Sequence, residues 1–218
     1  MTVWLPVALG RDIEPGAATG TTVDGSSVAL WRDAGGTLHA WADRCPHRGM
    51  RLSFGFVRDD RLVCLYHGWQ FDGDGACRHV PAHPRMEPPG SVRPTRYRAF
   101  ERGGLVWVSS ADPADDTELS RIPSVATPVR SVWIREGREQ VVDRLRSFTE
   151  DFQDKGTVAV GILDGTAILA GIQVVDAQTT ALHLIAPGAV PDDTVRALVR
   201  RIHDIRESAT AFAPVVAS

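Results

Sequence analysis

Short apolar segments separated by turn residues fill the first half of the chain. Apolar segments at 27–31 and 37–41 flank Asp-Ala-Gly-Gly at 33–36, a pattern typical of a β-hairpin. A second turn, rich in Asp and Gly, follows at 72–75. Short strands at this spacing predict a small all-β domain over residues 1–110.

The pattern changes after a polar, proline-containing stretch, which predicts a linker over 111–130. Beyond the linker, apolar residues recur at helical spacing and predict an amphipathic helix over about 138–153. The residues that carry this period are Val141, Leu145, Phe148 and Phe152. The Lys155-Gly156 pair ends the predicted helix.

Three strand-like segments follow, at 157–163, 167–175 and 179–185. Asp164-Gly165, between the first two, is a strong signal for a two-residue hairpin turn. A second amphipathic helix comes next, and its apolar face consists of Val195, Leu198, Val199, Ile202 and Ile205. Residues 131–218 are therefore predicted to form a small α+β domain.

Composition narrows the class of protein. Hydrophobic residues make up 43% of the 218 residues, which is enough for a packed core. A net charge of −3 argues against a nucleic-acid partner. The chain has no apolar run of the roughly 18 residues that a membrane span needs, and its first residues do not resemble a signal peptide. We therefore expect no membrane partner and a cytoplasmic location, with the cysteines reduced.

The candidate chemistry is concentrated in residues 45–69. Cys45 and His47 form a Cys-x-His pair, and Cys64 and His67 form a Cys-x-x-His pair. Two thiolates and two imidazoles suit either zinc or a mixed-ligand iron–sulfur centre. A zinc finger normally pairs its cysteines in one arm and its histidines in the other. Here each arm carries one of each, which fits a Rieske [2Fe–2S] centre.

The residues at 45–49 and 64–75 resemble the Rieske domain of ring-hydroxylating and demethylating oxygenases. The resemblance implies that Cys45 and Cys64 hold one iron and that His47 and His67 hold the other. The neighbouring motif residues, which the resemblance places at the cluster, are Arg48, Gly49, Tyr66, Gly68 and Trp69. The remaining thiol, Cys77, lies just past a turn, where we expect a small packed residue.

The motif also indicates which kind of Rieske centre to expect. In the cytochrome bc type, each cluster loop carries an extra Cys that forms a disulfide clamp, but Met50 and Tyr66 stand at those positions here. Trp69 and Phe71 replace the residues whose hydroxyls bond the cluster sulfurs in that type. Fewer hydrogen bonds to sulfur stabilise the reduced cluster less. We therefore expect a potential of roughly −150 mV and a ferredoxin or flavin reductase as electron donor.

In these oxygenases a helix-grip domain follows and holds one catalytic iron with two His and a carboxylate. Residues 147–152 resemble the segment that precedes the helical His pair, and Glu150 or Asp151 is a candidate bridge to an adjacent cluster, or else part of a solvated helix face. The His pair itself does not follow. Only His183 and His203 remain, so we expect no mononuclear Fe(II) in this chain and assign no catalytic residue.

The expected fold is an all-β Rieske domain followed by a small α+β domain like a truncated helix-grip domain. The expected function is a Rieske electron-transfer subunit that passes single electrons from a reductase to a mononuclear iron in a partner oxygenase subunit. The resemblance implies a trimer-based hetero-oligomer. Two alternatives stay open. One is a compact oxygenase that holds its own iron through His183, His203 and a carboxylate. The other is a non-catalytic scaffold or sensor subunit that contains the cluster.

Overall fold

The computed structural model describes residues 4–110 and 119–210. The contacts divide them into two compact units: the first contains 11–100 and 108–110, and the second contains 4–10, 101–107 and the chain from 119 onward. The first eight residues of the predicted linker, 111–118, lie outside the described residues. The rest of the predicted linker contains the 3-10 helix η3 (Leu119–Arg121) and the start of β11 (Ala126–Ile134).

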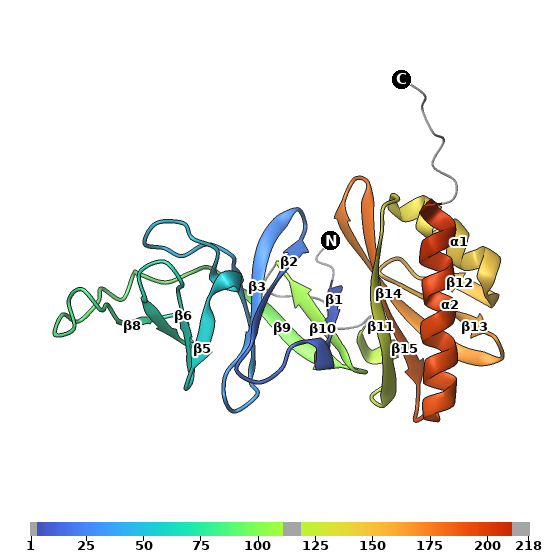
Figure 1. Ribbon diagram of the computed structural model, residues 1–218, viewed down its shortest axis with the longest axis horizontal. Coiled ribbons are helices and arrows are strands. Elements are labelled where there is room, and N and C mark those ends of the chain that lie inside the picture. Colours follow the sequence, from blue (N-terminus) through green and yellow to red (C-terminus); the bar gives the residue numbers. More distant parts are fainter. Residues whose placement is uncertain (1–3, 111–118, 211–218) are drawn as a thin grey trace, which may run out of the picture. The chain divides into compact units, whose positions relative to one another are not determined.

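The first unit is built from two antiparallel sheets and short connections (Figure 1). One sheet has six strands in all. Of these, β2 (Ala18–Val23), β3 (Ser26–Arg32) and β4 (Leu38–Ala42) lie in the first unit, together with β9 (Arg96–Arg102) except for its last two residues. The other sheet contains β5 (Phe56–Arg58), β6 (Arg61–Val63), β7 (Gln70–Asp72) and β8 (Cys77–His79). The 3-10 helix η2 (Leu52–Phe54) lies between them in sequence. The hairpin predicted at 33–36 joins β3 to β4.

The core of the first unit contains all three cysteines. Trp31 and Trp41 lie at its centre, with ring centroids 4.9 Å apart in an edge-to-face arrangement. Their fully buried neighbours include Leu52, Leu62 and Phe71. Because residues of both sheets and of η2 pack into one cluster, the core fixes the position of the loops that leave the strand ends.

The second unit contains a five-stranded antiparallel sheet in the order β11-β15-β14-β13-β12. Its further strands are β12 (Glu150–Asp154), β13 (Val158–Leu163), β14 (Thr166–Asp176) and β15 (Thr179–Pro187). The three strands predicted from the sequence are β13, β14 and β15. Asp164 and Gly165 both have positive φ, 48° and 78°, as the predicted two-residue hairpin turn requires.

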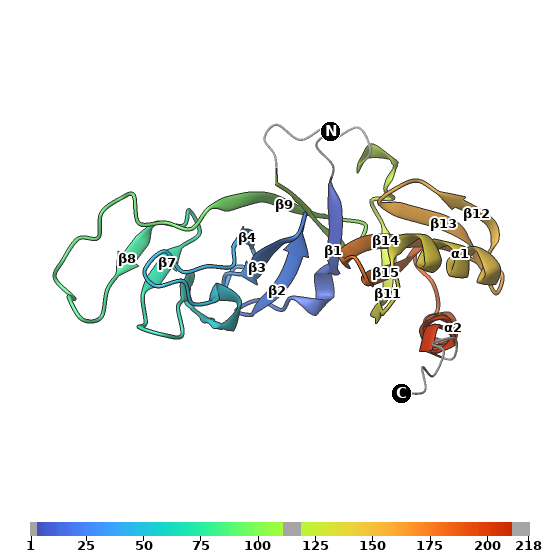
Figure 2. The same ribbon diagram turned by 90° about the horizontal axis from the view of Figure 1, so that it is seen from above.

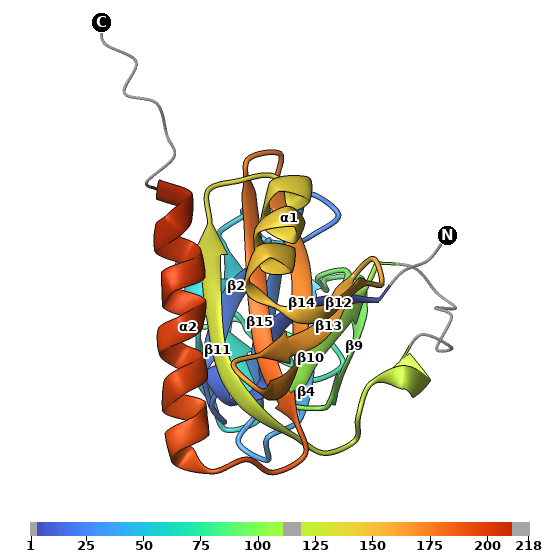
Figure 3. The same ribbon diagram turned by 90° about the vertical axis from the view of Figure 1, so that its right-hand side faces the viewer.

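Two helices cover one face of this sheet, α1 (Arg138–Phe148) and α2 (Asp192–Thr210). Figure 2 shows β1 (Leu5–Leu9) against the opposite face, and Figure 3 looks onto the helices. Strand β10 (Leu105–Ser109) begins in the second unit. At Gly171 a Cβ atom would lie 2.8 Å from Pro6, so only glycine permits β1 to approach β14 this closely.

The predicted helix over 138–153 is wrong in its second half. Helix α1 ends at Phe148, and residues 150–154 form β12, which pairs with β13. The Thr149 hydroxyl donates to the carbonyl of Leu145 at 2.7 Å, and this side-chain bond competes with continuation of the helix. Phe152 still packs against the same apolar core from the strand, which explains why it fitted the helical period.

The expected fold class is confirmed, because an all-β unit is accompanied by a small α+β unit. None of the helices within 4–110 and 119–210 is long and apolar enough to cross a membrane.

Candidate metal centre

The two ligand loops close with the same hydrogen bond. The N–H of Cys45 donates to the carbonyl of Met50 at 2.8 Å, and the N–H of Cys64 donates to the carbonyl of Trp69 at 2.9 Å. Each bond links residues five positions apart, one loop following β4 and the other following β6. The fold therefore presents the two loops as a matched pair, each beginning with a cysteine.

A glycine four residues after each cysteine allows the chain to reverse direction within each loop. Gly49 and Gly68 donate to the carbonyls of Cys45 and Cys64 at 2.8 and 3.0 Å. Their φ angles are 77° and 68°, in the left-handed region that residues with a Cβ atom rarely adopt. A Cβ atom at Gly68 would also lie 3.1 Å from Pro81. The two motif glycines are thus required by the shape of the loops.

A buried carboxylate holds the base of the first loop. Asp43 is 6% exposed and accepts two hydrogen bonds from Ser53, one from the N–H and one from the hydroxyl, both at 2.7 Å. These bonds connect the residues on either side of the loop 45–50. The sequence analysis missed both residues, because nothing in their spacing distinguishes them from ordinary turn residues.

The thiols lie inside the unit and the imidazoles lie at its surface. Cys45 and Cys64 are each 2% exposed, whereas His47 is half-buried and His67 is exposed. The two imidazole centroids are 4.7 Å apart. The four predicted ligands thus form two pairs, the adjacent thiols of Cys45 and Cys64 and the imidazoles of His47 and His67.

This paired arrangement fits a binuclear cluster better than a single ion. Within the described ranges 4–110 and 119–210, no three His, Cys, Asp or Glu side chains converge closely enough to hold one metal ion. A structural zinc site would need all four ligands on one ion. A Rieske [2Fe–2S] cluster needs only two protein ligands for each iron, which the thiol pair and the imidazole pair would provide.

The two buried thiols would stay protonated unless a bound cation stabilised their thiolates. Burial raises the pKa of the Cys45 thiol to about 12, and the adjacent Cys64 thiol adds to the rise. The backbone N–H groups of His47 and Arg48 donate to the Cys45 sulfur, and these hydrogen bonds lower its pKa and so offset part of the rise. Burial also lowers the pKa of His47, with smaller contributions from the charges of His67 and Arg48. A neutral imidazole keeps the lone pair that coordination requires, and bound metal would stabilise the thiolate.

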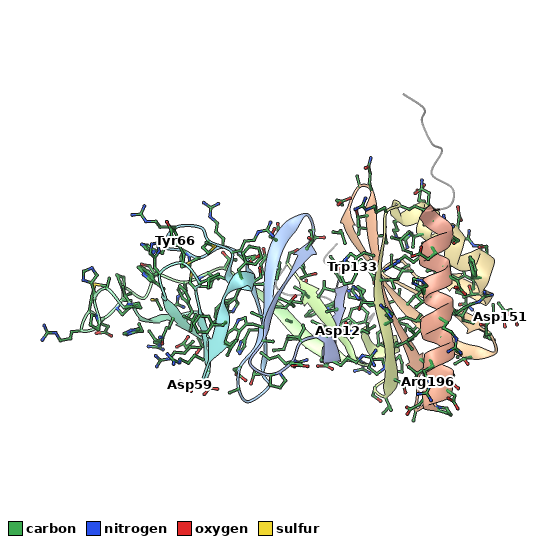
Figure 4. All side chains as sticks on the ribbon, in the orientation of Figure 1. Asp12, Asp59, Tyr66, Trp133, Asp151 and Arg196 are labelled. Atoms are coloured by element: carbon green, nitrogen blue, oxygen red, sulfur yellow. The ribbon has the colours of Figure 1, made fainter. Side chains whose placement is uncertain are left out.

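Two aromatic residues of the second loop stack on the ligand imidazoles. The Trp69 ring lies parallel to His47, with centroids 4.2 Å apart and an interplanar angle of 7°. The Tyr66 ring lies 3.8 Å from His67 and is tilted by 33°. Tyr66 is 57% exposed, at the surface of the first unit (Figure 4). The motif identified both residues, but not their role of holding the ring orientations.

The other motif predictions have mixed outcomes. The Arg48 side chain is exposed, and this residue touches the site through its backbone N–H, which donates to the Cys45 sulfur. Cys77 is the packed residue that we predicted, because it is 6% exposed and its thiol donates to the carbonyl of His79 at 3.8 Å.

His183 and His203, the candidates for a second iron site, lie in different environments. His183 is completely buried, and its ring nitrogens contact the Ser131 hydroxyl at 2.9 Å and the Gln173 side-chain oxygen at 3.1 Å. Burial lowers the pKa of His183 to about 4. His203 is exposed on α2, 4.0 Å from Glu207.

Comparison with known proteins agrees with this geometry. Residues 3–96 match the family model of the Rieske [2Fe-2S] domain. Oxidoreductase NdmD of Pseudomonas putida is 34% identical over 191 residues, which cover 83% of this chain and 32% of NdmD. The 4beta-methylsterol monooxygenase of Methylococcus capsulatus is 41% identical over 127 residues, or 56% of this chain and 34% of that protein. The chain thus spans about a third of the length of these relatives.

Among solved structures, apo dicamba monooxygenase has the same fold. The TM-score is 0.72 at 18% sequence identity, and the match covers 96% of this chain and 85% of that chain. The loop geometry, the domain match and the shared fold lead to one conclusion. The chain is a Rieske [2Fe–2S] domain protein related to the alpha subunits of Rieske non-heme iron oxygenases.

Proposed function

We propose that this chain is an electron-transfer component of a Rieske oxygenase system. It accepts single electrons from a reductase and passes them to a mononuclear iron in a partner subunit. The observation that carries the proposal is the contrast between two groups of histidines. His67 is exposed beside His47 at the cluster site, whereas His183 is buried with both ring nitrogens in polar contacts.

The bound [2Fe–2S] cluster would supply one-electron storage. Cys45 and Cys64 would hold the inner iron, where their burial excludes water. His47 and His67 would hold the outer iron, and the exposed edge of the His67 ring offers a short path to a docked partner. Trp69 and Tyr66 keep the two rings in fixed orientations by stacking on them.

The sequence relatives support an oxidoreductase role that involves both units. A match that covers 83% of the chain must include much of the second unit, and this match is to a protein named as an oxidoreductase. The match to the monooxygenase covers only 56% of the chain. Of these two relatives, the one named as an oxidoreductase thus matches the larger part of this chain.

A basic groove beside the first ligand loop supports docking of an acidic electron donor, either a ferredoxin or a flavin reductase. The groove has a volume of about 530 Å³, is open to solvent, and is lined by His47 and by Arg44, Arg48 and Arg93. Complementary charge accelerates encounter between redox partners at low salt.

Charge reversal tests this docking site. In Arg44→Glu/Arg93→Glu we expect reduction by ferredoxin to slow by about tenfold at low ionic strength, and the difference to shrink at high salt. Arg58→Glu is the matched control, because Arg58 lies in the β5–β6 hairpin next to Asp59, away from Tyr66 (Figure 4). Equal rates for the double variant and the control would contradict a donor site in this groove.

We propose that the acceptor is an oxygenase subunit in a trimer-based hetero-oligomer. Glu150 and Asp151 are exposed on β12, where either carboxylate is available to a cluster of an adjacent chain. The test is onward transfer. The reduced chain is mixed, without oxygen, with a Rieske oxygenase whose own cluster ligands have been removed. Cluster reoxidation in step with loss of the partner's ferric signal supports the role, and no reoxidation by any such partner contradicts it.

The compact oxygenase is the second candidate, and it is favoured by the structural match that covers 85% of a monooxygenase chain. It requires a third iron in this chain and turnover without a partner. A scaffold or sensor role would leave the cluster unreduced by any reductase. Iron content and reducibility therefore separate the three functions.

A further inference from the structure

The arginines of the basic groove beside the first ligand loop have no acidic partners. Arg44, Arg48 and Arg93 line this groove, and none of the described residues that line it is acidic. Within residues 4–110 and 119–210, no Asp or Glu side chain forms an ion pair with any of the three. Three positive charges without neutralising partners therefore share one solvent-open groove of about 530 Å³.

A backbone hydrogen bond brings arginines that are distant in sequence to the same groove. The N–H of Ala42 donates to the carbonyl of Thr95 at 2.8 Å, and this bond joins the end of the strand before Arg44 to the segment after Arg93. The Arg93 Nε donates to the carbonyl of Gly90 at 2.8 Å. The Arg93 side chain is thus held by its inner nitrogen, which leaves its terminal nitrogens for a ligand.

Arg44 is held over the first ligand loop. Its Nε lies 3.4 Å from the position that a Cβ atom would occupy at Gly49, so the absence of a side chain there leaves room for the guanidinium group. His47, the predicted ligand of the outer iron in this loop, also lines the groove. A charge bound in the groove would therefore act directly on the electrostatics of the cluster site.

The groove chemistry favours a tetrahedral oxyanion. A guanidinium group presents N–H donors in a planar fork that matches the oxygens of phosphate, and such charge-assisted hydrogen bonds are among the strongest in proteins. A phosphate ion has enough oxygens to accept from two guanidinium groups at once. Because the groove is open, the ion keeps part of its hydration, and the desolvation cost is smaller than in a closed site.

We propose that this groove binds an inorganic oxyanion of the phosphate type between Arg44 and Arg93, and that the oxidised cluster site binds it more tightly than the reduced one. Reduction adds one negative charge to the cluster, and this charge repels the bound anion. By linkage, the anion must lower the reduction potential to the same extent as reduction weakens its binding.

The oxyanion would restrain reduction of the cluster and compete with an acidic donor for the same arginines. This regulatory meaning rests on the proposed function. Binding and the shift in potential do not, because they need neither a donor nor an acceptor protein.

Calorimetric titration of the oxidised, iron-loaded chain with inorganic phosphate, in Tris chloride at constant ionic strength, tests the site. We expect saturable binding to one site, and Arg44→Gln/Arg93→Gln should weaken it by about tenfold. The matched control is Arg58→Gln/Arg130→Gln, which removes the same charge from exposed arginines that do not line the groove. Absence of saturable binding, or equal binding by the two double variants, would overturn the site.

Voltammetry with and without saturating phosphate tests the link to the cluster. We expect phosphate to lower the potential by about 30 mV, which is a threefold difference in affinity at about 59 mV per tenfold change. The shift should persist in the control variant and disappear in Arg44→Gln/Arg93→Gln. An unchanged potential in the parent chain, or an equal shift in both variants, would contradict the link. Donor and acceptor assays are separate, so failure of the electron-transfer role would leave these results unaffected.

Discussion

Three buried thiols lie in the core of the first unit, and position in a ligand loop distinguishes two of them from the third. Cys45 and Cys64 begin the two matched loops, whereas Cys77 lies on β8 and donates to a carbonyl. We expect Cys45→Ser and Cys64→Ser to lose the Rieske-type EPR signal of the reduced protein and most of the bound iron. Cys77→Ser, a change of the same size at another buried site, should keep both. Loss of the signal in Cys77→Ser alone would contradict the ligand assignment.

The second prediction at the residue scale concerns the reduction potential of the cluster, which depends on the side chains near its sulfurs. Phe71 is fully buried and carries no hydroxyl, and the face of Trp69 is taken up by His47. With no hydroxyl donors from these positions, the reduced cluster gains little stabilisation. Protein-film voltammetry should give a potential near or below about −100 mV, in the lower part of the Rieske range. A value above about +100 mV would refute the role given to these two residues.

At the scale of elements, Asp43 connects the end of β4 to η2 across the first ligand loop. Asp43→Ala removes two hydrogen bonds from a buried carboxylate, and we expect the free energy of unfolding to fall by about 3 kcal/mol, with weaker iron retention. Ser53→Ala removes only the hydroxyl bond and should cost about 1–2 kcal/mol. Urea denaturation and iron analysis measure both effects.

The matched control for the Asp43 prediction is Ser110→Ala. Ser110 donates to Asp24 at 2.7 Å, the same length as the Ser53 bond, but at the surface. Its loss should change stability by less than about 0.5 kcal/mol. If Ser110→Ala were as destabilising as Ser53→Ala, burial of the Asp43 pair would not explain the effect.

His183 links β15 to its neighbours β11 and β14 and makes the second unit sensitive to acid. Its pKa is about 4 in the folded chain against 6.5 for the free side chain, because burial opposes the charge. Between these values the unfolded chain binds a proton that the folded chain excludes. Stability is therefore fully present above about pH 6.5 and falls as the pH drops toward 4, by up to about 3 kcal/mol from this group.

A difference measurement isolates this contribution. Chemical denaturation of the iron-loaded chain and of His183→Gln, at several pH values from 7 to 4, gives two curves of unfolding free energy. The variant is expected to have a lower stability at pH 7 and a flatter pH dependence. Identical slopes would show that His183 titrates in the same way in the folded and unfolded chains.

The sequence predicted most features that depend on local spacing. The Cys and His positions, the glycines after them and the Asp164-Gly165 turn all carry strong local signals, and the structure has the corresponding loops and hairpin. Stacking of Trp69 on His47 depends on how two loops meet in space, so spacing alone did not reveal it. The end of α1 was missed because pairing of β12 with β13 outweighs the helical period.

At the scale of the whole molecule, the chain combines a cluster site with a small α+β unit. The sequence likeness to NdmD extends into that unit, and the fold matches an oxygenase chain. A second unit in which His183 is enclosed within the sheet suits a structural or docking role better than oxygen activation. Under the proposed function, a partner subunit carries out the oxygen chemistry.

The most direct test of the proposed function is metal analysis of the iron-loaded chain, combined with assays of oxygen consumption in the presence of a reductase. An electron-transfer component should contain two irons per chain, both in the cluster, and should form no oxygenated product alone. It should be reduced by one electron and reoxidised by the partner subunit. Three irons per chain, together with O2-dependent product formation by this chain and a reductase only, would contradict the proposal and establish the compact oxygenase.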